Sequence, residues 1–130
     1  MKKDETGPHV RDAFKNTAAK IKKFESLLAT LSSTDDKKKA LWRDIYANAV
    51  YDRESASVLH TDLFISMQQM PSGANKFAAH TTCGPLLVKY IEKMSKSNDQ
   101  ILKLAELVSK ETDKQDVVDS DDLFNEIGGK

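Results

Sequence analysis

The residues best suited to chemistry in this chain are three histidines, one cysteine and a few clustered charges. His9, His60 and His80 lie far apart in the sequence. None of them is spaced with a Cys, Asp or Glu in the way that a four-ligand zinc site requires. We therefore expect no metal site, and we interpret the three histidines as surface or partly buried side chains.

Cys83 is the only cysteine, so the chain cannot form an internal disulfide, which is typical of proteins in a reducing compartment. It precedes Gly84 and Pro85 at an expected helix start, a position that can activate a thiol, and His80 is close enough in sequence to act as a base. The sequence contains neither a nucleophile-elbow motif nor a glycine-rich phosphate loop. A small buried or loop cysteine is the better interpretation. We expect a protein that is not an enzyme and has no cofactor.

Two charged groups are candidate contacts for another macromolecule. Asp52, Arg53 and Glu54 are consecutive, and a solvated or salt-bridged helix face is their simplest interpretation. Residues 37–39 are lysines at an expected helix start, where a solvated face is again favoured over a phosphate contact. The net charge is zero, so any contact with DNA is expected to be weak or indirect.

The spacing of apolar residues predicts two helices in the first half of the chain. Over residues 9–31 they recur at steps of three, four or seven, which places them on one helix face: Val10, Phe14, Ile21, Phe24, Leu28 and Leu31. Residues 32–36 carry short oxygen-bearing side chains that can cap a helix, so we expect a break there. The second helix is expected over residues 35–70, with five apolar positions seven residues apart: Trp42, Ala49, Ala56, Leu63 and Met70.

Pro71 and Gly73 are expected to end the second helix. A third helix is expected over residues 85–112, with Pro85 in its first turn. Its predicted apolar face consists of Leu87, Tyr90, Ile91, Met94, Ile101, Leu104, Leu107 and Val108. The middles of the two long helices, residues 48–57 and 97–99, are polar, and we expect them to meet in an antiparallel hairpin.

In residues 111–122 the regular spacing of apolar residues stops and acidic residues predominate. Leu123, Phe124 and Ile127 follow within an acidic frame, and a helical conformation would bring them together. Such a segment is typical of an apolar anchor that fills a groove on a partner. The same segment could instead fold back on its own bundle, and the sequence supports both alternatives equally.

These patterns predict an all-α fold, an elongated antiparallel helical bundle or hairpin of three main helices with an acidic C-terminal tail. The expected organisation is a flexible N-terminus (1–8), a helical domain (9–112) and an acidic tail with the apolar anchor (113–130). No alternating run indicates a strand. No apolar run approaches the ~20 residues of a membrane helix, and no leader segment is visible. We therefore expect a cytoplasmic protein with no membrane partner.

Two blocks of sequence, residues 41–53 and 88–107, resemble small early or middle proteins of T-even-type tailed phages. Over residues 38–127 the chain resembles the phage RNA polymerase-binding protein family (RpbA), whose members have about this length. The resemblance implies a protein of the infected bacterial cytoplasm that binds host core RNA polymerase and modulates transcription, without catalytic residues. No contact residues carry over from that family. The candidate partner-binding residues are therefore those found from the sequence itself: Asp52, Arg53, Glu54, Leu123, Phe124 and Ile127.

A second resemblance is to the small terminase subunit of tailed phages, a helical hairpin that forms rings and assists DNA packaging. Residues 94–104, with their Asn-x-x-Ile-Leu-Lys-Leu pattern, carry this resemblance, and residues 120–128 are compatible with it. It implies self-association into a large oligomer, and polar helix middles flanked by apolar ends suit helix–helix assembly between chains. The acidic tail and the lack of a DNA-reading element leave the choice between the two families open.

Overall fold

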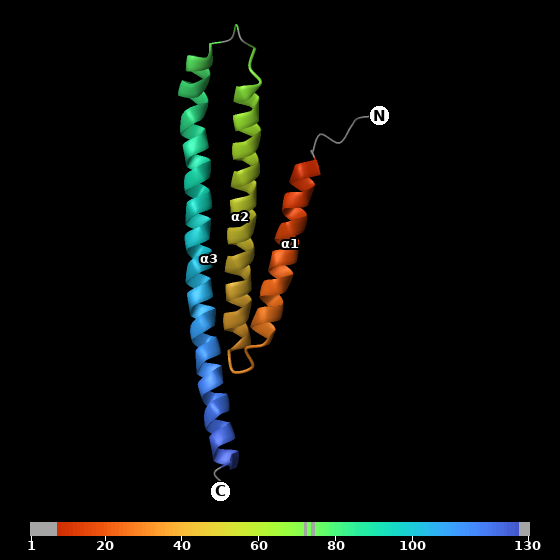
Figure 1. Ribbon diagram of the computed structural model, residues 1–130, viewed down its shortest axis with the longest axis vertical. Coiled ribbons are helices and arrows are strands. Elements are labelled where there is room, and N and C mark those ends of the chain that lie inside the picture. Colours follow the sequence, from red (N-terminus) through yellow and green to blue (C-terminus); the bar gives the residue numbers. More distant parts are fainter. Residues whose placement is uncertain (1–7, 72, 74, 128–130) are drawn as a thin grey trace.

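The structure, a computed structural model, describes residues 8–71, 73 and 75–127, and the side chains of residues 12, 14–71, 73 and 75–115. Three consecutive antiparallel helices make up the described chain: α1 (Pro8–Ala29), α2 (Asp36–Gln68) and α3 (Lys76–Ile127). α2 lies between α1 and α3 (Figure 1) and packs against both. The predicted all-α architecture is confirmed, and the described residues contain no strand.

The three helices differ greatly in length. α1 contains 22 residues, α2 contains 33 and α3 contains 52. At ~1.5 Å per residue these correspond to about 33, 50 and 78 Å. α1 therefore runs beside only part of α2, and the end of α3 extends past the α1–α2 loop (Figure 1). The molecule has three helices side by side at one end and a two-helix hairpin at the other.

The hydrophobic core lies at the three-helix end, next to the α1–α2 loop. Trp42 of α2 is 4% exposed there. It packs within a cluster drawn from all three helices and the loop: Phe24, Leu28, Leu31, Trp42, Leu104 and Val108. Phe24 stacks on Tyr46 with ring centroids 4.2 Å apart. Most of the predicted apolar residues of α1 and α2 are buried, whereas Phe14 is 36% exposed.

The starts of α2 and α3 are set by capping side chains. Asp35 accepts a hydrogen bond from the backbone N–H of Lys37 at the start of α2, as the sequence predicts. The predicted start of the third helix at Pro85 is wrong, because α3 begins at Lys76 and Pro85 lies inside it. Asn75 provides the missed cap, since its Oδ1 accepts from the N–H of Ala78 over 3.1 Å.

Two further predictions about α3 need correction. Ile91 and Leu107, assigned to its buried face, are 51% and 42% exposed, whereas Leu104 and Val108 are buried. The helix also does not end near residue 112, because it continues to Ile127 without a break. No glycine or proline occurs between Pro85 and Gly128, so nothing in the backbone chemistry stops it. The predicted flexible segment, residues 1–8, lies outside the described residues apart from Pro8.

Replacement of the core tryptophan tests this packing. Trp42→Ala should lower the free energy of unfolding by about 3–5 kcal/mol, because it leaves a cavity among three helices. Leu27→Ala is the matched control at the rim of the same core, where the side chain is 46% exposed, and it should cost under about 1 kcal/mol. Urea unfolding followed by circular dichroism measures both. Equal costs for the two variants would contradict the core described here.

Candidate interaction surfaces

The charged group of α2 lies at the middle of the molecule, where it connects α2 to both neighbouring helices. Three polar contacts form there: Lys93 Nζ lies 3.3 Å from Asp52 Oδ2, Arg53 Nη1 donates to Asn98 Oδ1 over 3.0 Å, and Lys20 Nζ lies 3.5 Å from Glu54 Oε1. We call these six residues the polar waist. The predicted meeting of the two polar helix middles is thereby confirmed.

Small buried side chains surround the polar waist. Ala49 and Ala56 of α2, Ser97 of α3 and Thr17 of α1 are all buried. Such residues let helix backbones approach closely, while exposed ion pairs contribute at most ~1 kcal/mol each. The polar waist therefore mainly determines which residues of neighbouring helices face each other. It contributes little to the free energy of folding. Binding of a partner by Asp52, Arg53 and Glu54 stays a prediction, although each already has a contact within the chain.

The predicted apolar anchor lies on the last turns of α3. The backbone of residues 116–127 continues the helix, and the side chains of Leu123, Phe124 and Ile127 lie outside the described side chains. The last described tertiary contact of α3 is made by Gln115, whose Nε2 donates to the carbonyl of Thr30 over 3.0 Å. The anchor's role in binding stays a prediction.

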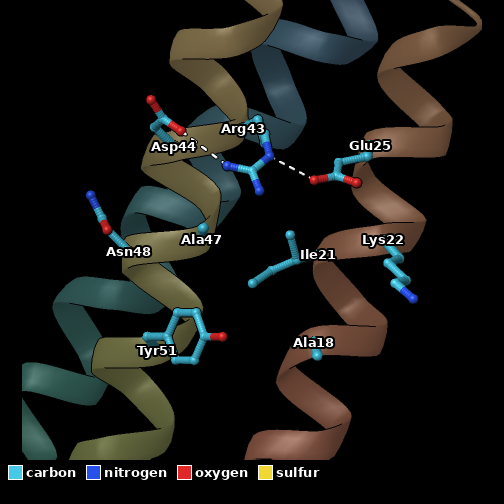
Figure 2. A pocket seen from close by; sticks show the side chains of 9 residues that line it. All are labelled: Ala18, Ile21, Lys22, Glu25, Arg43, Asp44, Ala47, Asn48 and Tyr51. Atoms are coloured by element: carbon cyan, nitrogen blue, oxygen red, sulfur yellow. Dashed lines mark hydrogen bonds and ion pairs between the residues drawn. The ribbon is translucent and has the colours of Figure 1, made fainter.

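An open groove of about 500 Å³ lies between α1 and α2. Figure 2 shows the Arg43 guanidinium between two carboxylates, with its Nε 2.6 Å from Glu25 Oε1 and its Nη1 3.2 Å from Asp44 Oδ1. The hydrogen bond and charge of Glu25, and then those of Asp44, raise the pKa of Arg43 above its usual value. Two carboxylates therefore already bind this cation, and Lys22 is the other cationic side chain that lines the groove.

A second groove, of about 340 Å³, is lined mainly by apolar groups where α1 and α3 face each other across Tyr46. Phe24 and Leu27 line its α1 side. Its α3 side consists of Ile101, Ala105, Val108, Ser109 and Thr112. The groove exists because α1 packs on α2 and makes little contact with α3.

The largest feature that the sequence interpretation missed is the two-helix end, residues 57–71, 73 and 75–96, which we call the distal hairpin. None of its described side chains is buried. Seven of its large apolar side chains are exposed: Leu59, Phe64, Ile65, Phe77, Leu86, Val88 and Ile91. A usable signal was present in the sequence, because residues 63–88 contain Lys76 and no other Lys, Arg, Asp or Glu.

The histidine and cysteine side chains of the distal hairpin lie apart from one another. His60 stacks on Phe64 with ring centroids 6.3 Å apart, and Cys83 is partly exposed. Among the described residues, no group of three His, Cys, Asp or Glu side chains could hold a metal ion. No described helix is long and apolar enough to cross a membrane.

Polar side chains of α3 bind the α1–α2 loop and the first turn of α2, and we call this contact the loop latch. Glu111 accepts from Lys38 Nζ over 2.9 Å and from Thr34 Oγ1 over 3.1 Å. Gln115 accepts from the backbone N–H of Ser32 over 2.9 Å. The hydrogen bond from Lys38 is the main cause that lowers the pKa of Glu111 below its usual value of 4.5. The ionised carboxylate therefore helps to close the core over Trp42.

The loop latch should make stability depend on pH. A carboxyl group whose pKa is lower in the folded state stabilises the fold fully above its unfolded pKa, here 4.5, and loses that contribution as the pH falls through its folded pKa. Between about pH 7 and about pH 3, wild type should lose more unfolding free energy than Glu111→Gln. Asp113→Asn, outside the latch, should follow wild type. Urea unfolding at a series of pH values measures this, and parallel curves for all three proteins would contradict it.

No family model, curated protein sequence or solved structure matches this chain. The function proposed next therefore rests on the sequence of this chain and on the contacts, burial and charges of its described residues.

Proposed function

We propose that this chain is a non-catalytic protein that self-assembles through its α2–α3 hairpin, and that it serves as a small terminase subunit in phage DNA packaging. The observation that supports this most is the distal hairpin, which has no buried side chain although it is rich in apolar groups. Two helices alone cannot enclose a core, so most stable helical folds pack three or four. A further chain would supply the missing layer.

The exposed apolar area is large enough for a specific interface. Each of the seven large side chains of the distal hairpin exposes on the order of 100 Å², about half of its full area. Together the seven expose roughly 700 Å² of apolar surface on each chain, divided between different sides of the hairpin, and contacts with more than one neighbouring copy would be needed to cover it.

The low charge of this surface favours a second copy over a strongly charged partner. Lys76 is the only Lys, Arg, Asp or Glu in residues 63–88, so two copies would not repel each other there. Depletion of charge is also the compositional mark of an interface core. The resemblance of residues 94–104 and 120–128 to small terminase subunits supports the same assignment, since those proteins act as oligomers.

Substitution of the exposed apolar surface tests self-assembly. Wild type should behave as an oligomer in light scattering at micromolar concentration, and the double variant Val88→Glu/Ile91→Glu should be monomeric, because it places two carboxylates in the exposed apolar surface of every copy. Leu27→Glu, a similar change outside the distal hairpin, should remain oligomeric. The fluorescence of Trp42, the single tryptophan, should stay unchanged in the monomer because its core is separate. A monomeric wild type would refute the proposal.

The second candidate function is binding to host core RNA polymerase and modulation of transcription in the infected cytoplasm. The resemblance over residues 38–127 supports it, as does the continuation of α3 as a helix through the acidic segment that carries Leu123, Phe124 and Ile127. A helix that extends beyond the latch is free to present these residues to a groove on a partner.

A co-purification experiment separates the two functions. If the chain binds the polymerase through its anchor, wild type should retain the β or β′ subunit from host lysate. The triple variant Leu123→Ser/Phe124→Ser/Ile127→Ser should lose it while keeping its oligomeric state. Retention of neither subunit by wild type would reject this function, and equal retention by both proteins would reject the anchor.

A further inference from the structure

The hairpin exposes two different apolar surfaces, and they lie on opposite sides of α3. The first, which we call the leucine face, consists of four residues that are between 42% and 58% exposed: Leu41, Leu59, Leu86 and Leu107. At 100° per residue, Leu41 and Leu59 lie along one line of α2 with Asp52. Leu86, Lys93 and Leu107 lie within an arc of about 60° on α3. The ion pair of Asp52 with Lys93 shows that both sets of residues are on the same side of the hairpin.

The second surface, which we call the outer stripe, follows the opposite side of α3. It consists of Phe77, Val88, Ile91 and Leu102, which are all at least 51% exposed. Spacings of 11 and 3 residues keep them within a narrow arc, about half a turn away from Lys93. A shallow hollow lined by Leu102, Ala105 and Ser109 continues this stripe towards the latch.

Along the border of each surface runs a row of side chains that all carry the same sign of charge. The leucine face borders four exposed lysines of α3 at seven-residue spacing: Lys89, Lys96, Lys103 and Lys110. The outer stripe borders three exposed acidic residues at the same spacing: Glu92, Asp99 and Glu106. Residues seven apart drift by only ~20° per repeat around a helix, so each row runs nearly along its surface. The two rows lie beside each other on α3 at spacings of three and four residues, between the two surfaces. The row nearest the leucine face is basic and the row nearest the outer stripe is acidic, so these two borders are complementary to each other.

We infer that the outer stripe of one copy packs on the leucine face of the next copy, with the acidic row of the first beside the lysine row of the second. This inference rests on the proposed self-assembly and specifies its contact. A two-fold dimer through either surface would place like charges side by side, which costs binding energy, and would leave the other surface uncovered. A contact between two different surfaces continues from copy to copy until the assembly closes.

Two charge-reversed variants test the contact. The first, Lys96→Glu/Lys103→Glu, makes the lysine row acidic, and the second, Glu92→Lys/Glu106→Lys, makes the acidic row basic. Each variant alone would place like charges across every contact, so its half-assembly concentration should rise by roughly tenfold or more. An equal mixture should assemble as wild type does, because each reversed row then meets its complement on the other variant. Lys22→Glu/Lys23→Glu, the same charge change on α1, is the matched control and should assemble alone.

Light scattering on the separate and mixed variants decides the outcome. Assembly of the mixture but of neither variant alone supports the inference, and it also shows that both variants are folded. Unimpaired assembly of the first variant alone would indicate a stripe-to-stripe dimer, and unimpaired assembly of the second alone would indicate a leucine-to-leucine dimer. Either result overturns the inference, as does failure of the mixture to assemble. In all these cases an oligomeric wild type leaves the proposed self-assembly intact, whereas a monomeric wild type refutes that proposal itself.

Discussion

The short length of α1 is the constraint on which the rest of this structure depends. With 22 residues beside an α2 of 33 and an α3 of 52, α1 can complete a three-helix core at one end only. At that end Trp42, Leu104 and Val108 are buried. At the other end α2 and α3 cover only one side of each other, so half-exposed apolar groups are the direct result of the difference in length.

The two ends are joined by polar contacts that fix geometry. The polar waist connects α2 to both neighbours through Lys93, Asn98 and Lys20, around buried small residues. The loop latch holds the α1–α2 loop against Glu111 and Gln115. These contacts connect α2 with both neighbouring helices at the core end and at the middle of the molecule, and they hold the helices in register. A hairpin presented in a fixed direction is suited to repeated contacts between identical chains.

Much of the fold could be predicted from the sequence because the apolar spacing around Trp42, Ala49 and Ala56 is regular. Pro85 misled the prediction, since proline favours a first turn but is tolerated inside a helix at a cost, and Asn75 was overlooked as the earlier cap. The distal surface was missed for a different reason. Periodicity identifies apolar faces, but it does not state whether a neighbouring helix is long enough to cover them, as Ile91 and Leu107 demonstrate.

The central claim is that the distal hairpin receives its core from another chain, and amide hydrogen exchange at different protein concentrations tests it most directly. Amides between Ala56 and Ser97 should be protected at high concentration and should exchange rapidly after dilution. Amides around Trp42 and Leu104 should stay protected under both conditions, because their core lies within one chain. Equal and strong protection of the distal amides in a dilute monomer would contradict the account, since two helices would then be stable alone.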